Sequence, residues 1–169
     1  MKDRKTLRAF TLLETLVALS IVAIIAAFGI NFLATVIKDG SKATVISEIK
    51  QNGNYAMDVM TYYIRNATSI QSCTSSSLTL KNGTDDIVFT RLPNDGLNLN
   101  SRIASNSTIL TSADKETGVD VASLTFTCDL NRVPPLVKIQ MQIKQSYWIT
   151  RPESSATVDF NTNAALRSY

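Results

Sequence analysis

The feature that most constrains this chain is an uncharged apolar stretch of 23 residues, TLVALSIVAIIAAFGINFLATVI, at Thr15–Ile37. A helix of that length spans the hydrocarbon core of a bilayer. Thirteen of its residues are Leu, Ile, Val or Phe, and together they favour insertion by roughly 4–8 kcal/mol, at about 0.3–0.6 kcal/mol each. The stretch therefore predicts a membrane-spanning helix close to the N-terminus.

The positive charge of the 169-residue chain is concentrated in front of this stretch. The whole chain has 17 Lys and Arg against 14 Asp and Glu, and residues 1–9 alone carry a net charge of +3. Basic residues beside an apolar span stay in the cytoplasm, so the N-terminus is predicted there and the remainder is predicted to be exported. Because the rest of the chain is balanced, with no basic stripe, no nucleic-acid partner is expected.

The helix is predicted to continue beyond the membrane to about Ala67. No proline occurs between Lys38 and Ala67, and apolar or small residues recur at steps of three and four, as on one face of an amphipathic helix. These positions are Ile46, Ile49, Gly53, Ala56, Met60, Tyr63 and Ala67. A single helix from Phe10 to about Ala67 follows.

After Ala67 the apolar period falls to two, which is typical of strands. Strands are predicted at residues 77–81, 87–89, 121–128, 136–144 and 156–160, and Leu97, Leu99 and Ile103 mark a weaker strand or loop. Asn82-Gly83 predicts a two-residue hairpin turn, and residues 100–120 are predicted to form a long surface loop. The expected fold class is α+β, with the outer half of the helix packed on an antiparallel sheet of about four to six strands.

The composition also limits the chemistry. The chain has no histidine, which removes the commonest general base and metal ligand. Cys73 and Cys128 lack metal-type spacing, and in an exported domain they are expected to form a disulfide, with two buried free thiols as the alternative. No catalytic residue, metal site or cofactor is predicted, and the chain is not expected to be an enzyme.

Glu14 is unusual because it opens the apolar span. An acidic residue at such a place indicates a function by default, although a carboxylate at the level of the lipid headgroups could simply be tolerated. The basic leader, the small residue Ala9, Phe10 and the sequence Thr-Leu-Leu-Glu that ends at Glu14 together resemble the N-terminus of type IV prepilins and type II secretion pseudoprepilins.

This resemblance implies a pilin-like fold and three segments: a leader at residues 1–9, a transmembrane and filament-core helix at 10–37, and an exported head at 38–169. It implies that a prepilin peptidase cuts between Ala9 and Phe10 and N-methylates the Phe10 amine. Glu14 would then pair with that amine in a neighbouring subunit and set the register of assembly. The implied partners are the peptidase, membrane lipid before assembly, and other pilin or pseudopilin subunits contacted through the N-terminal helix.

The implied location is the cytoplasmic (inner) membrane, crossed once, and afterwards an extracytoplasmic pilus or pseudopilus. The residue before the cut is usually Gly in this family and is Ala9 here. Residues 54–70 and 160–167 resemble the helix end and the terminal strand of minor subunits, which predicts a minor rather than a major subunit. Two other readings remain open: a permanently anchored single-pass binding module, and a secreted protein with an ordinary signal peptide cut after Ala27.

Overall fold

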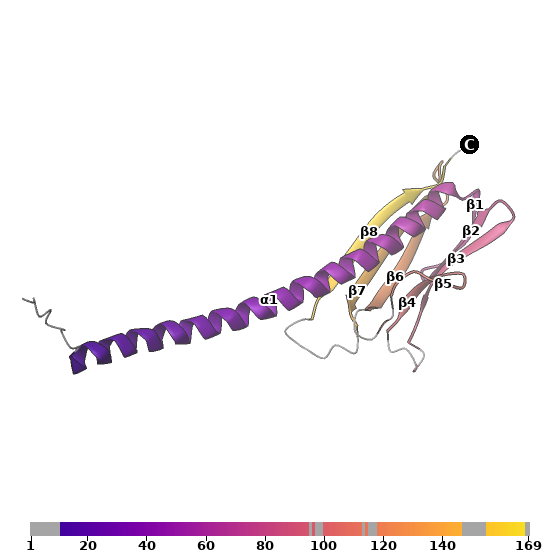
Figure 1. Cartoon of the computed structure of the whole chain (residues 1–169). Coiled ribbons are helices and arrows are strands. Elements are labelled where there is room, and N and C mark those ends of the chain that lie inside the picture. The colour runs from indigo at the N-terminus through magenta and orange to yellow at the C-terminus, as the bar shows by residue number, and fades with distance from the viewer. Residues whose placement is uncertain are drawn as a thin grey trace, which may run out of the picture. The chain divides into compact units, whose positions relative to one another are not determined.

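A computed structural model describes residues 11–94, 96, 100–112, 114, 118–146 and 155–167. The chain divides into two compact units, residues 1–40 and 41–169. One helix, α1 (Leu12–Asn66), is followed by eight described strands. They are β1 (Ser69–Cys73), β2 (Ser77–Asn82), β3 (Asp85–Leu92), β4 (Arg102–Ser105), β5 (Thr108–Ile109), β6 (Val119–Asp129), β7 (Leu136–Gln145) and β8 (Thr157–Ala165). The α+β class and the single long helix are confirmed (Figure 1).

The outer part of α1 packs into the core of the second unit through the stripe that the sequence predicts. Ile49, Ala56 and Met60 are fully buried, while Lys50 and Asp58 on other faces are exposed. The apolar residues at steps of three and four therefore mark the face of α1 that is buried in the folded chain. Burial of this face is the main source of stability for an amphipathic helix.

The strands form two antiparallel sheets, where the sequence predicted one sheet of four to six strands. The first sheet has the order β1-β2-β3-β4-β5 and the second has the order β6-β7-β8. The single-sheet prediction was wrong because alternation identifies strands but not their partners. The two sheets meet along β6, where the amide of Val121 donates to the carbonyl of Ser101 (3.0 Å) and the amide of Phe126 donates to that of Ser75 (3.1 Å).

The predicted disulfide is present and joins the two sheets. Cys73 ends β1 in the first sheet, Cys128 lies in β6 of the second, and their Cα atoms are 6.4 Å apart. The bridge closes a loop with a sequence separation of 55. A cross-link over such a loop stabilises by about 4 kcal/mol in the chain-entropy model.

The hairpin between β2 and β3 differs by one residue from its prediction. Asn82 still pairs with Asp85 in the ladder, so the two-residue loop is Gly83-Thr84 rather than Asn82-Gly83. Gly83 has a φ of +63°, and a glycine at the first loop position is what a type II′ turn requires.

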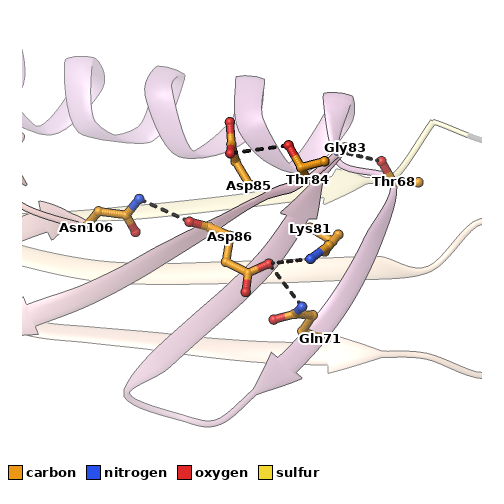
Figure 2. A network of polar contacts seen from close by, with 8 residues as sticks. All are labelled: Thr68, Gln71, Lys81, Gly83, Thr84, Asp85, Asp86 and Asn106. Carbon is orange, nitrogen blue, oxygen red and sulfur yellow. Dashed lines mark hydrogen bonds and ion pairs between the residues drawn. The ribbon is translucent and has the colours of Figure 1, made fainter.

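A polar network braces this hairpin, as Figure 2 shows. The Asp86 carboxylate accepts from Lys81 Nζ (3.1 Å) and from Gln71 Nε2 on β1 (3.0 Å). Asn106, which has a φ of +52°, donates to the Asp86 carbonyl (3.1 Å) and accepts from the amide of Val88 (2.7 Å). Asparagine tolerates this left-handed conformation better than most residues. Asn106, in the turn between β4 and β5, therefore holds that turn against β3 through these two hydrogen bonds.

The prediction of a surface loop at residues 100–120 was wrong for most of the part that the structure describes. That part contains β4, β5 and the start of β6. Asn100, Ser101 and Thr111 are buried, and the Ser112 amide donates to Asn52 Oδ1 on α1 (2.8 Å). The polar composition misled the prediction because these side chains are buried with hydrogen-bond partners, which the residue type alone does not reveal.

Three more regions of the head differ from the sequence prediction or are only partly described by the structure. β1 was not predicted, because its alternation is weak and mostly polar. β8 extends to Ala165, five residues beyond the predicted strand. Leu97 and Leu99 lie outside the described residues, whereas Ile103 is fully buried in β4.

Candidate assembly site on the N-terminal helix

The first half of α1 presents an apolar surface that is exposed among the described residues. Leu12, Leu13 and Phe28 are 81, 73 and 73 % exposed, and α1 is the one described helix long and apolar enough to cross a membrane. Burying one such side chain is worth about 1.5–3 kcal/mol. The segment is therefore built for contact with lipid or with other apolar helices.

The hydroxyl and amide side chains within this segment are matched to such surroundings. Thr15, Ser20, Asn31 and Thr35 each donate to a carbonyl of the helix itself, at 2.9, 2.8, 2.9 and 3.0 Å respectively. A polar hydrogen satisfied within its own helix needs no water. These side chains thus do not oppose burial of the helix.

Glu14 differs from them. Its carboxylate is exposed, and no hydrogen bond or ion pair connects it to another residue within the described segment 11–37. Removing an unpaired carboxylate from water costs several kcal/mol. A cation or a hydrogen-bond donor from outside the described residues would therefore favour burial of this part of the helix with Glu14 ionised.

The local structure fixes where Glu14 lies on the helix. Its amide donates to Thr11 Oγ1 (3.3 Å) and to the Thr11 carbonyl (3.1 Å), and the Thr15 amide donates to the same carbonyl (3.2 Å). Thr11 is thus the N-cap and Glu14 the third helical residue, with one of the two hydrogen bonds of a capping box, that from the Glu14 amide to Thr11 Oγ1. The sequence pattern Thr-x-x-Glu could have predicted this helix start and was missed. The Glu14 carboxylate lies in the first turn, at the positive end of the helix dipole, where a negative charge is favourable.

The proposed processing residues are not placed by the structure, because Ala9 and Phe10 lie outside the described residues. The described helix begins two residues after Phe10, at Leu12.

Comparison with known families decides the nature of this N-terminus. The prokaryotic N-terminal methylation motif matches residues 4–30. The chain carries the hallmark of type IV prepilin-like and pseudopilin-like proteins. The match includes residues 4–9 of the leader, Phe10, Glu14 and most of the apolar span, and it ends before the head. No curated protein and no solved structure matched the chain.

The motif and the exposed apolar helix together fit a membrane-anchored pilin-like protein. Proteins with this motif are structural. Among the described residues of the head, no group of three or more His, Cys, Asp or Glu side chains could hold a metal ion. Its cavities are open grooves, including one of about 720 Å³ between α1 and the ends of β7 and β8.

Proposed function

We propose that the chain is a structural subunit of a type IV pilus or pseudopilus, stored in the cytoplasmic membrane with its N-terminus inside the cell. A prepilin peptidase removes residues 1–9 by cutting between Ala9 and Phe10, and it methylates the new Phe10 amine. The protein performs no catalysis itself. The observation that carries the proposal is the match of the methylation motif to an apolar segment, residues 12–37, whose single carboxylate, that of Glu14, has no partner among the described residues.

The chemistry of Glu14 supports this role. Removal of the leader removes a net charge of +3 that would hinder extraction of the helix from the bilayer. The cut also creates an amine at Phe10, and in an apolar bundle this amine is the cation that Glu14 of a neighbouring subunit requires. Because leaving one partner of a buried pair unmatched costs about 3–5 kcal/mol, the pair selects one axial register.

N-terminal sequencing of the chain recovered from membranes and from sheared fibres tests the proposal. A start at N-methylated Phe10 in both fractions is the expected result. A start at Met1 with no chain in the fibres would instead identify a permanently anchored module, and a start after Ala27 a secreted protein. The assignment as a minor subunit, suggested by residues 54–70 and 160–167, stays a prediction.

A further inference from the structure

β8 lies at one edge of the second sheet (Figure 1), and its ladder with β7 uses only half of its backbone groups. The Gln145 amide donates to the Ala156 carbonyl (3.2 Å), and the Leu166 amide donates to the Pro135 carbonyl (3.1 Å). Between these two pairs the ladder continues without a shift. Because residues of an antiparallel strand alternate in the side to which they hydrogen-bond, the even-numbered residues of β8 bond to β7.

The odd-numbered residues of β8 therefore turn their amide and carbonyl groups away from β7. These groups have no hydrogen-bond partner among the described residues. The side chains of the same residues are exposed except for that of Ala165, which is half-buried. The residues are Thr157, Asp159, Asn161, Asn163 and Ala165. Their backbone groups are called the free edge of β8 below. Such a row of unpaired groups is a template for another strand.

The other described sheet edges are protected against such pairing. β1 and β6 each contain a shift of register, β5 has only two residues, and β6 is also hydrogen-bonded to the first sheet at Val121 and Phe126. Bulges, short strands, proline and lysine are the usual means by which proteins block an edge. β8 has nine residues in continuous register, with no proline and no lysine. Its free edge is therefore open.

A groove accompanies the end of this free edge. It has a volume of about 720 Å³, and its lining includes Asn163 and Ala165 of β8 together with Asp58, Tyr62 and Arg65 of α1. A strand added to β8 would lie about 4.8 Å from it, and every second side chain of that strand would point toward α1. Tyr62 is 62 % exposed there. The groove thus offers these side chains both space and an aromatic contact.

We propose that the free edge of β8 binds an extended segment of another protein, which adds a fourth strand to the second sheet. The segment carries apolar and polar side chains in alternation. Its apolar side chains point toward α1, on the face where Phe160 contacts that helix, and its polar side chains continue the face of Asp159 and Asn161. In strand addition of this kind the main-chain hydrogen bonds give affinity and the alternate side chains give specificity.

A second copy of β8 is a poorer occupant. The strands of this sheet pair antiparallel, and two copies of β8 joined in that way would be related by a two-fold axis. The outer halves of their α1 helices would then point in opposite directions. Copies stored in one membrane point in the same direction, so a different protein is the expected partner. This choice of partner rests on the proposed function, whereas the binding itself does not.

Peptide binding to the purified full chain in detergent tests the free edge. The probe is a fluorescent nine-residue peptide of alternating threonine and valine, made soluble by lysine at each end, and binding is measured by fluorescence anisotropy up to about 1 mM peptide. Residues opposite each other on paired strands have side chains on the same face. The threonine amides of the bound peptide would therefore face β8, and the valine amides would face away.

Two modified peptides make the test specific for the backbone. N-methylation of the threonine amides is expected to weaken binding at least about tenfold. N-methylation of the valine amides is the matched control and should change binding little. Equal binding of the two methylated peptides, or no binding of the unmodified peptide, would overturn the proposal. Because no fibre takes part, that failure would leave the proposed function standing.

Variants of Asn161 separate the backbone from the side chain. Asn161→Pro removes one amide of the free edge and keeps the bonds of β8 to β7, and proline is tolerated in an edge strand at such a position. It is expected to weaken peptide binding at least about tenfold. Asn161→Ala keeps the amide and should bind as the wild type does. Unchanged binding by a folded proline variant would overturn the proposal.

Hydrogen exchange of the wild type gives a readout that does not depend on how the proline variant folds. Bound peptide is expected to slow exchange at the amides of Asp159, Asn161 and Asn163 and to leave those of Phe160 and Thr162 unchanged, because they already bond to β7. Protection confined to other parts of the chain would overturn the site. Dimers of the purified chain that protect the same free-edge amides without peptide would identify a second copy as the occupant and overturn the choice of partner.

Discussion

Gly53 on α1 and Phe160 on β8 are in direct contact, and the contact leaves no room for a side chain at position 53. A Cβ at Gly53 would overlap the Phe160 ring. Glycine within a helix costs about 1 kcal/mol relative to alanine, and here the ring of a strand over 100 residues away occupies the space that the missing side chain leaves. The glycine thus lets β8 lie close to α1, as seen in Figure 1.

Gly53→Ala is expected to lower the free energy of unfolding of the head by about 1–3 kcal/mol, because overpacking forces the ring or the helix to move. The measurement is urea unfolding of the full chain in detergent, followed by the near-ultraviolet signal. Gly40→Ala is the control, since a Cβ at Gly40 meets nothing within 4 Å, and it should be neutral or slightly stabilising. Adding Phe160→Leu should recover part of the loss, and equal losses for the two glycine variants would contradict the packing argument.

Removal of the Cys73–Cys128 bridge is expected to lower the free energy of unfolding by about 4 kcal/mol. The chain that carries both Cys73→Ala and Cys128→Ala should unfold at a much lower urea concentration than the wild type. A reductant should move the wild type toward that midpoint and leave the double variant unchanged. A double variant as stable as the oxidised wild type would show that the contacts along β6 hold the two sheets together without the bridge.

Under the proposed function, Glu14→Gln is expected to leave cleavage after Ala9 intact and to reduce entry into fibres roughly a hundredfold or more, because the proposed buried ion pair would lose one partner. Quantitative blotting of the membrane and fibre fractions measures both steps. Thr11→Val separates the two roles of this turn, since it removes the cap (about 1 kcal/mol) and keeps the charge. Should Thr11→Val impair entry as severely as Glu14→Gln, capping rather than pairing would explain the requirement.

Asp120→Ala is expected to destabilise the head by about 1–3 kcal/mol. The Asp120 carboxylate accepts from the buried amide of Ser101 (2.7 Å), and the alanine would leave that amide unpaired. Asp120 also forms an ion pair with Lys144 (3.2 Å), but the Lys144 side chain is 48 % exposed. Lys144→Met should therefore cost at most about 1 kcal/mol. Comparable losses for the two variants in urea unfolding would show that the ion pair matters more than the hydrogen bond.

The sequence by itself determined the features that arise from the chemistry of consecutive residues. The uncharged span, the leader, the Ala9–Phe10 junction and the position of Glu14 are local, and the stripe from Ile49 to Met60 follows from helical periodicity alone. The disulfide was also predictable, because a chain with two cysteines, Cys73 and Cys128, offers one pairing within itself.

Only the tertiary structure decided which strands pair and which polar residues leave water. The division into two sheets, the burial of Asn100 and Ser101, and the contact of Gly53 with Phe160 each depend on residues distant in sequence. Alternation assigns a side chain to a face but not to a partner, and the cost of burying a polar group depends on a hydrogen bond supplied from elsewhere in the chain. Folding therefore settles these features, since only the folded chain brings both members of each contact together.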